Sequence, residues 1–465
     1  MFTPNTTWKG TLPGDVRLLL HRLQQKGITA YIVGPAVRDA LAQDEMEKVT
    51  RIDIFAMARS VADVESVLDG ASTSTLFFGR TERTRRNGLA LQVQAGDSGE
   101  LVRRFVITVL ADAADFKEEL MKREVTVNAM AMDGEGGIVD LFDGQRDLAA
   151  RQIRTLIPTG RVFQQRPLFL VKVAKHIAYH GFEASDDTEL NAARFAHSII
   201  DMPMERVRPE LERMLLNRHP DQGLDFLQRV GVLGMVLPEV QLMVGFDETC
   251  QVHHKDLWAH TRQVVMQSKP LAAIRWAALL HDIGKVWTRT VDEDMKVHFL
   301  RHEEMSALLF RGIAARLGFD GRLAERVLYL IANHSRVNMY SGEWTDSAVR
   351  RLMRDVGDRL DDLMQLSRAD ITSRQEHRVE HLTRQLDELD TRIAEQREEA
   401  NRKPLLPKGA GEIIMKHFGL PPSPVIGTLK QSLEAAIEDG RLPPDRPVEE
   451  YLGFLQELIR NSSGR

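Results

Sequence analysis

An apolar stretch of the chain ends in two adjacent polar residues that are suited to metal binding. Residues 275–280 (RWAALL) form an apolar helical run, and His281, Asp282, Gly284 and Lys285 follow it. Burying an imidazole beside a carboxylate is costly unless a partner neutralises the pair. A divalent cation does this, because imidazole and carboxylate are ordinary ligands for such ions. One His-Asp dipeptide is weak evidence, so the case depends on other ligands.

Further candidates flank this dipeptide. His260 lies at the start of an apolar-periodic helix, and His302, His334 and Asp370 lie on or at the end of later helical segments. For any one histidine alone, a satisfied core or surface residue is the simpler interpretation. The order His, His-Asp, His, His, Asp resembles the HD superfamily of metal phosphohydrolases. That resemblance implies six metal ligands, namely His260, His281, Asp282, His302, His334 and Asp370.

The implied chemistry is metal-assisted attack on a phosphoester. Nitrogen and oxygen ligands without thiolate suit Mn, Fe, Ni, Co, Mg or Zn, and we expect two divalent ions with Asp282 between them. A bound ion lowers the pKa of its water and neutralises charge that develops on phosphorus. Lys285 follows His281 by one helical turn and projects to the same side. A lysine that only faces the helix dipole fits the spacing equally well, but the family pattern favours phosphate contact, so Asp282 and Lys285 are the predicted catalytic residues.

The N-terminal part of the chain predicts a small mixed sheet with helices packed on it. An amphipathic helix is predicted from residue 13 to Gly27, where a glycine ends it. Strands are predicted over residues 30–33, 51–55, 89–93 and 105–110. The overall expectation is an α+β, mostly helical protein, with this sheet domain followed by helical domains.

Two motifs in this part resemble a known enzyme head. Residues 34–39 (GPAVRD) follow the first predicted strand, and residues 122–131 (KREVTVNAMA) follow the last. Both are similar to motifs of the bacterial tRNA nucleotidyltransferase (CCA-adding)/poly(A) polymerase family. The resemblance continues through Arg161–Gly181, in the place of the nucleotide-templating helix, and covers nearly the whole chain. It implies a nucleotide- or RNA-binding site at Gly34, Arg38, Asp39, Asp53, Arg123 and Asn128.

This head also departs from the family pattern. The family's Asp-x-Asp pair reads Arg51-Ile52-Asp53, its third carboxylate aligns with Phe105, and its Gly-Gly turn reads Gly34-Pro35. Proline removes a backbone donor, and metal-dependent nucleotidyl transfer needs paired carboxylates. The templating Glu-Asp-x-x-Arg is replaced at residues 165–169 (QRPLF). We therefore predict a head that has lost nucleotidyl transfer, in which Asp53 is contested by Arg51.

Composition limits the remaining possibilities. The chain has 465 residues, enough for about three domains. We expect a head over residues 1–150, a helical neck over 151–250, an HD domain over 251–375 and a helical tail over 376–465. A net charge of −5 gives no global signal for nucleic acid, and a single cysteine excludes an internal disulfide. The chain starts without a signal-like segment and has no membrane-length apolar run, so we expect a cytoplasmic protein.

These observations lead to one main hypothesis and two alternatives. The main hypothesis is a metal-dependent phosphohydrolase (phosphodiesterase or phosphatase) that acts on a nucleotide or RNA end and is carried on an inactive head. Its expected partners are tRNA-like RNA or a nucleotide. The first alternative is an active tRNA CCA-adding or poly(A)-adding enzyme. The second is a non-catalytic RNA-binding or regulatory protein with a structural metal.

Overall fold

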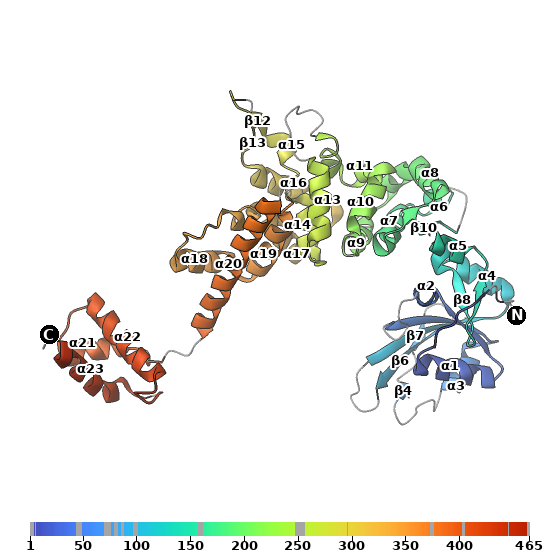
Figure 1. Ribbon diagram of the computed structural model, residues 1–465. Helices are drawn as coiled ribbons and strands as arrows, with labels where there is room; N and C mark the ends of the chain where they lie inside the picture. Colours follow the sequence, from blue (N-terminus) through green and yellow to red (C-terminus); the bar gives the residue numbers. More distant parts are fainter. Residues whose placement is uncertain are drawn as a thin grey trace. The chain divides into compact units, whose positions relative to one another are not determined.

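The structure is a computed structural model, and it divides into two compact units. It describes residues 4, 6–42, 49–68, 76–78, 82–84, 88–95, 101–156, 161–246, 256–294, 296–372, 376–401, 405–444 and 446–462. One unit contains Met1–Ser341 and Val356–Leu386, and the other contains Gly342–Asp355 and Asp387–Arg465. The first unit is described in three parts: the head (residues 4–156), the neck (161–246) and the histidine domain (256–341 and 356–386). Figure 1 shows the chain coloured along its sequence.

The head is built on one mixed sheet. Its strands follow the order β1-β9-β8-β2-β3-β7-β6-β4, and β5 pairs with β6. β3 and β7 run parallel, whereas the other pairs are antiparallel. The strands are β1 (Thr6–Thr7), β2 (Thr29–Val33), β3 (Arg51–Met57), β4 (Leu76–Phe78), β5 (Glu82–Thr84), β6 (Gly88–Ala95), β7 (Leu101–Leu110), β8 (Met130–Met132) and β9 (Gly137–Asp140).

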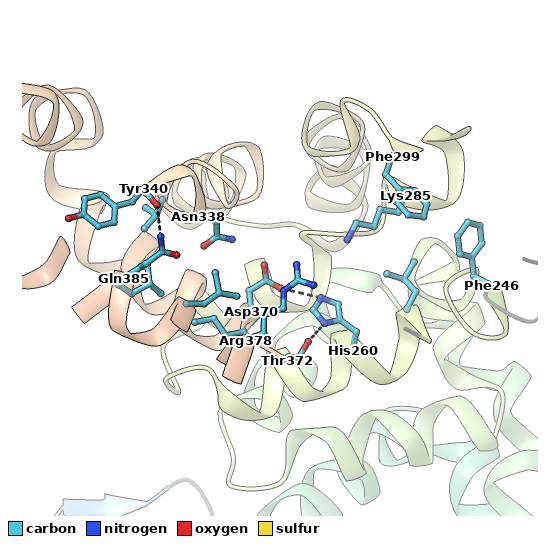
Figure 2. A pocket seen from close by; sticks show the side chains of 15 residues that line it. Phe246, His260, Lys285, Phe299, Asn338, Tyr340, Asp370, Thr372, Arg378 and Gln385 are labelled. Carbon is cyan, nitrogen blue, oxygen red and sulfur yellow. Dashed lines mark hydrogen bonds and ion pairs between the residues drawn. The ribbon is translucent and has the colours of Figure 1, made fainter. Parts of the chain in front are cut away.

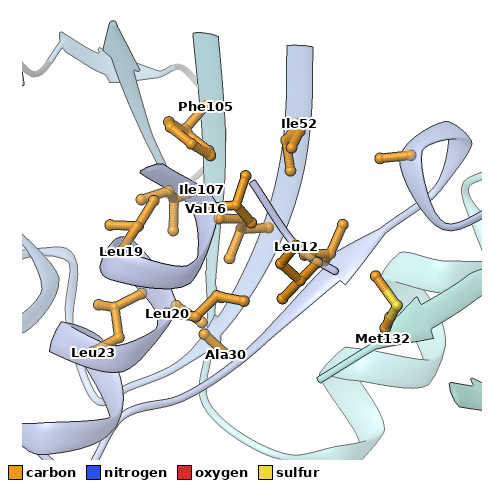
Figure 3. Packing of buried hydrophobic residues seen from close by; sticks show 14 of the residues in the cluster. Leu12, Val16, Leu19, Leu20, Leu23, Ala30, Ile52, Phe105, Ile107 and Met132 are labelled. Carbon is orange, nitrogen blue, oxygen red and sulfur yellow. The ribbon is translucent and has the colours of Figure 1, made fainter. Parts of the chain in front are cut away.

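Helices cover both faces of the described sheet. Side chains alternate between the faces along each strand, so β3 sends Ile52 and Ile54 to one face and Phe55 to the other. The first face packs against α1 and α3, as Figure 3 shows for Leu19 of α1 beside Ile107 of β7. The second face packs against α4. The helices of the head are α1 (Gly14–Gln25), α2 (Pro35–Leu41), α3 (Val61–Leu68), α4 (Ala113–Met121) and α5 (Gly144–Ala149).

The register of the sheet corrects one residue assignment. In the parallel pair, Asp53 lies beside Val106, and Arg51 lies beside Arg104. Phe105 is fully buried in the core under α1, on the face opposite to Asp53. Because a shift of one residue moves a side chain to the other face of a sheet, Phe105 was the wrong position for a carboxylate partner of Asp53.

The neck is helical, with one small strand pair. The single templating helix expected over residues 161–181 is instead two helices, because the residue before Pro167 is biased away from helical geometry. α7 then ends at Gly181, which has a φ of +64°. Its elements are α6 (Arg161–Gln165), α7 (Phe169–His180), α8 (Asp186–Phe195), α9 (Met204–Leu215), α10 (Pro220–Arg229), α11 (Val232–Val236), α12 (Pro238–Gln241) and β11 (Glu183–Ala184), which pairs with β10 (Gln152–Ile153) at the end of the head.

The histidine domain is organised around α14, the predicted apolar run. All residues from Ala273 to Leu280 are buried, as expected for a helix that is apolar on every side. Its other elements are α13 (Leu257–Gln267), α15 (Lys285–Thr288), β12 (Arg289–Val291), β13 (Val297–Phe299), α16 (His302–Leu317), α17 (Gly321–Asn333), α19 (Leu360–Asp370) and the start of α20 (Glu376–Asn401).

The second unit has an apolar core of its own. Leu433, Tyr451 and Leu455 are at its centre. Its helices are α18 (Asp346–Val356), the later part of α20, α21 (Ala410–Phe418), α22 (Pro424–Glu438) and α23 (Val448–Ser462). Within the described part of the chain, no helix is both long and apolar enough to cross a membrane. The predicted class, an α+β and mostly helical protein with an N-terminal mixed sheet, is confirmed.

Candidate metal centre and nucleotide pocket

Helix ends bring the predicted metal ligands together. His281 directly follows α14, His302 is the first residue of α16, and His334 directly follows α17. Asp370 is the last residue of α19, while His260 lies in the first turns of α13. At these ends the side chains leave the apolar packing between helices and meet in one place.

The six side chains form two groups that share a dipeptide. His260, His281 and Asp370 form one group, in which Asp370 Oδ1 lies 3.1 Å from His260 Nε2 and 3.5 Å from His281 Nε2. Asp282, His302 and His334 form the other. Asp282 Oδ1 lies 3.4 Å from His302 Nε2, and Asp282 Oδ2 lies 3.3 Å from His281 Nε2. The two oxygens of Asp282 therefore face different groups.

The histidines are oriented as metal ligands are. Their Nδ1 atoms lie 2.9 Å, 2.9 Å and 2.8 Å from backbone carbonyl oxygens at His281, His302 and His334, respectively. A carbonyl only accepts, so each Nδ1 carries the proton and Nε2 is left for another partner. In the described chain, the buried His281 Nε2 and Asp282 Oδ1 have no hydrogen-bond partner. These two orphaned atoms and the donor set fit divalent cations, so the histidine domain has two buried clusters suited to metal.

The electrostatics of the site favour positive charge at its centre. Burial raises the pKa of Asp282, but His281 and Lys285 outweigh burial and hold that pKa well below its usual value. Burial likewise lowers the pKa of His281, yet the Asp282 and Asp370 carboxylates raise it to about 10. Burial, reinforced by His281, lowers the pKa of His334 to about 4. A divalent cation among these ligands would supply the positive charge that the two carboxylates otherwise draw to His281 as a proton.

Lys285 is held against the same carboxylate. Its Nζ lies 2.5 Å from Asp282 Oδ2 and 5.7 Å from the centre of the Phe299 ring. The lysine thus lies on the side of the cluster predicted from its spacing. Its contact with a substrate phosphate stays a prediction.

Several further side chains support the predicted ligands. Thr372 Oγ1 lies 2.6 Å from His260 Nδ1, so it orients that ring as the carbonyls orient the other three. Ser306 Oγ accepts a hydrogen bond from the backbone N–H of Gly284 at 2.9 Å. Ser335 bonds to Glu303, next to His302. Supporting contacts of this kind carry no spacing signal, because each joins different segments through a single contact.

A cavity of about 500 Å³ opens beside the cluster. His260, Lys285 and Asp370 are on its wall, and Figure 2 shows them directed toward the same space. The cavity has an aromatic side at Phe246 and Phe299. Its other lining residues are Leu257, Val337, Asn338, Tyr340, Ile371, Thr372, Arg378, Leu382, Gln385 and Leu386.

A second cavity, of about 400 Å³, lies in the head around Asp53. Arg51 Nε lies 3.1 Å from Asp53 Oδ1, and Arg123 Nη1 lies 2.5 Å from Asp53 Oδ2. The predicted interaction of Arg51 with the Asp53 carboxylate is therefore a direct ion pair. Lys122 and Glu124 line the same cavity, so it combines two carboxylates with three cations.

The other predicted head residues lie around this cavity. Gly34 has a φ of +80°, and a Cβ there would lie 2.9 Å from Arg123 Nη1. Arg38 Nη1 donates to Asn128 Oδ1 at 2.5 Å, and Arg38 Nε donates to Asp39 Oδ1 at 2.8 Å. The structure thus gathers Gly34, Asp53, Arg123 and Asn128 at one site, with Arg38 behind them.

Asp112 and Asp115, the two carboxylates that follow β7, make local contacts. The Asp112 carboxylate caps α4 by accepting the N–H groups of Ala114 and Asp115. The Asp115 carboxylate accepts the N–H of Ala111 at 3.2 Å. Both carboxylates have local structural roles.

Glu124 joins the head to the neck, and sequence reasoning missed it. Its φ is +76°, a region that non-glycine residues rarely adopt. Its carboxylate lies 2.6 Å from Lys172 Nζ and 3.2 Å from His176 Nε2, both on α7. Burial raises the pKa of Glu124, but the hydrogen bonds from His176 and Lys172 outweigh it and lower the pKa to about 2. Glu124 and His176 line the head cavity.

Comparison with known families divides the chain in the same way. Residues 30–154 match the poly A polymerase head domain, and residues 181–243 match a probable RNA and SrmB-binding site of polymerase A. Residues 257–375 match the HD domain. A CC-adding tRNA nucleotidyltransferase of Thermus thermophilus is 31% identical over 349 residues, which cover 72% of this chain and 76% of the relative. The chain belongs to the CCA-adding tRNA nucleotidyltransferase/poly(A) polymerase family with an HD domain.

Other members and a solved structure agree with this assignment. A multifunctional CCA protein of Thioalkalivibrio sulfidiphilus is 30% identical over 295 residues, covering 62% of this chain and 69% of the relative. The Bacillus stearothermophilus CCA-adding enzyme, solved in complex with CTP, matches with a TM-score of 0.56 and 19% identity. That match covers 97% of this chain and 98% of the other, and it shows a shared fold.

The predicted loss of nucleotidyl transfer is contradicted. The relatives that align with this chain are named as CCA-adding and CC-adding enzymes, and residues 30–154 match the poly A polymerase head domain. The prediction was based on single residues of the motifs. In the structure, Asp53 lines a cavity together with Arg51, Lys122 and Arg123. The first alternative, an active nucleotidyltransferase, is better supported than an inactive scaffold.

Proposed function

We propose that this protein adds nucleotides from CTP or ATP to the 3′ end of tRNA in its head, and that its HD domain is a metal-dependent phosphohydrolase. The observation that carries the first activity is the alignment with CC-adding and CCA-adding enzymes over most of the chain. Relatives of the same fold bind CTP and ATP. The match of residues 181–243 to an RNA-binding segment supports tRNA as the partner.

The head cavity has the charge that a nucleoside triphosphate requires. Arg51, Lys122 and Arg123 line it on the side of Asp53. Guanidinium groups bind phosphate oxygens through two parallel hydrogen bonds. Fixed cations also stabilise the charge that develops on the leaving pyrophosphate. Asp53 orients both arginines, since each of its oxygens accepts from one of them.

The HD domain supplies the second activity. We assign His260, His281, Asp282, His302, His334 and Asp370 as ligands of two divalent ions, which when bound would supply a water of lowered pKa and neutralise phosphoryl charge. Asp282 faces both groups of ligands and is the residue between them. Lys285 would contact a phosphoryl oxygen of the substrate. We retain the proposed divisions at residues 1–150, 151–250, 251–375 and 376–465.

The transferase activity is tested by incorporation of labelled CTP and ATP into a tRNA transcript that lacks its 3′ terminal nucleotides. Asp53→Asn should lower incorporation by about 100-fold, because the arginines lose the carboxylate that positions them. Asp294→Asn is the control, since that carboxylate is 76% exposed in the β12–β13 hairpin. A wild-type protein that incorporates neither nucleotide would refute the proposal.

The phosphohydrolase activity is tested separately. The metal content of the purified protein is measured first, and hydrolysis of p-nitrophenyl phosphate and bis(p-nitrophenyl) phosphate is then assayed with each divalent ion. Wild type should hydrolyse at least one of these probes, and Asp282→Asn should hydrolyse neither. Metal-free protein that remains inactive after reconstitution would rule out this activity.

A further inference from the structure

The cavity beside the metal cluster is completed by a helix that lies outside the HD match. The match ends at residue 375, and α20 starts at Glu376. Arg378, Leu382, Gln385 and Leu386 of α20 nevertheless line the cavity. These residues recur every three or four positions, which is the spacing of one helix face.

This first part of α20 is packed against the histidine domain. Leu386 is 3% exposed, and Gln385 Nε2 donates to the backbone oxygen of Tyr340 at 3.5 Å. The same compact unit contains α20 up to Leu386. Packing of Leu386 and the hydrogen bond of Gln385 therefore hold this part of the cavity wall in place.

The two cations on the cavity wall differ in their partners. Lys285 Nζ is 2.5 Å from Asp282 Oδ2, so its charge is already matched inside the cluster. For Arg378, the described residues provide no hydrogen-bond or ion-pair partner. Figure 2 shows its guanidinium reaching from α20 into the cavity, toward His260 and Asp370. A guanidinium placed this way has its fork of N–H donors available for an anion.

The opposite part of the cavity is aromatic. Phe246 comes from the end of the neck and Phe299 from β13, and their ring centres are 6.5 Å apart. Aromatic side chains provide stacking surfaces for nucleobases. The volume of about 500 Å³ lies within the range of small-molecule sites, so it accommodates a mononucleotide.

We propose that this cavity is the substrate site of the HD domain, in which Arg378 of α20 binds the phosphate of a nucleotide whose base stacks on Phe246 and Phe299. The proposal rests on the phosphohydrolase function proposed above. It makes Arg378 a binding residue from outside the HD match. It also assigns the base to Phe246, at the end of the neck, and to Phe299, within the HD match.

The test measures equilibrium binding to the metal-free full-length protein by calorimetry. The probes are adenosine 3′-monophosphate and adenosine, which differ only by the phosphate. Arg378→Gln should weaken binding of the monophosphate by about 10-fold, the loss expected for a charge-assisted hydrogen bond, and should change adenosine binding by less than about 2-fold. Phe299→Leu should weaken both probes to a similar extent.

Arg384→Gln is the matched control. Arg384 is an exposed arginine on the same helix, six residues after Arg378 and absent from the cavity lining. Six residues correspond to about 600° of rotation, which places it on another face. Its substitution should leave the affinity for both probes unchanged. Melting temperatures of all variants show whether any loss of binding reflects unfolding.

The outcomes separate this inference from the function on which it rests. Equal binding of the monophosphate by wild type and Arg378→Gln would overturn the role of Arg378, as would equal losses for both probes or no binding by wild type. Hydrolysis of p-nitrophenyl phosphate by metal-loaded wild type, together with such a result, would leave the phosphohydrolase function standing. Arg378-dependent binding without hydrolysis of any probe would support the nucleotide site and refute the phosphohydrolase function.

Discussion

At the scale of single residues, the Asp282 carboxylate lies between the two ligand groups of the histidine domain. It is 1% exposed, and histidines from four different helical segments lie within 4 Å of its carboxylate oxygens. A buried carboxylate is costly unless cations or donors surround it. Asp282 is therefore the residue whose loss should affect both metal binding and stability.

Asp282→Asn should lower metal affinity by at least about 100-fold, because it removes the charged ligand shared by the two groups. The metal-free variant should also be destabilised by about 3–5 kcal/mol, since Lys285 and His281 lose the carboxylate that they face. Metal content by mass spectrometry and unfolding by urea check the two effects. Asp294→Asn should change neither, and normal metal content in Asp282→Asn would disprove the assignment of ligands.

Glu124 should give the stability of the head a pH dependence. Its pKa is lowered from 4.5 to about 2 in the folded protein. A depressed carboxyl pKa stabilises the fold above the unfolded value, and this contribution disappears as the pH falls from about 4.5 through about 2. We expect Glu124→Gln to cost about 2 kcal/mol at pH 7, after allowance for partial exposure of the side chain.

The measurement for Glu124 is urea unfolding followed by circular dichroism at pH 7 and pH 3. The difference between wild type and Glu124→Gln should shrink at the lower pH, because the unfolded wild-type chain is then largely protonated at Glu124, whereas the glutamine does not titrate. Glu135→Gln, on an exposed turn of the head, is the control. A difference that is independent of pH would mean that the ion pair with Lys172 contributes little.

At the scale of elements, the ends of helices place the ligands. The apolar run of α14 and the periodicity of its neighbours predicted that His281, His302, His334 and Asp370 would lie on helices or at their ends, and the structure has them at the ends. The supporting contacts of Thr372 and the carbonyl oxygens were not predictable. They depend on how separate helices cross, and crossing geometry leaves no periodic trace in the sequence.

Gly284 shows how closely two of these elements approach. A Cβ at this position would lie 2.6 Å from Ser306 N and closer still to the backbone oxygen of His302. Gly284→Ala should therefore move α16 and His302 away from Asp282, at a cost of about 1–3 kcal/mol. Thermal unfolding and metal content measure the effect.

Gly321→Ala is the comparison for this substitution, because a Cβ there meets no atom within 4 Å. It should leave metal content unchanged. Retention of full stability and metal content by Gly284→Ala would show that the backbones can separate without disturbing the centre.

In the head, the strands were predictable from their apolar residues, but the faces of the sheet were not fully assigned. The strands over residues 51–55 and 105–110 were predicted within a few residues of β3 and β7. The pairing of Asp53 with Val106 could not be read from either strand alone. Register depends on contacts between strands about 50 residues apart in sequence.

At the scale of the whole molecule, two sites of different chemistry lie in separate parts of one chain. The head cavity gathers cations around Asp53, and the histidine domain gathers imidazoles and carboxylates around Asp282. Among the residues that the structure describes, none contributes to both sites. Because substitutions at distant sites without shared partners act independently, each site should be removable by itself.

Asp53→Asn should lose tRNA extension and keep phosphoester hydrolysis within about 2-fold, and Asp282→Asn should show the opposite pattern. Both activities are measured on the same preparations, with melting temperatures as a check on folding. Loss of both activities in either variant, without a change in melting temperature, would indicate coupling between the sites.

The sequence by itself determined the fold class, the family and the order of the six metal-ligand candidates. These features depend on residue type and on spacing along the chain, and both can be read from the sequence directly. Only the tertiary structure joined Arg123 to Asp53 in an ion pair, and only it brought Arg378 of α20 to the cavity beside the metal cluster. The replaced motif residues in the head predicted an inactive site, and the comparisons with relatives contradicted this prediction. A binding site is made by side chains that converge in space from distant segments, and a change in one of its positions does not reveal what the others still do.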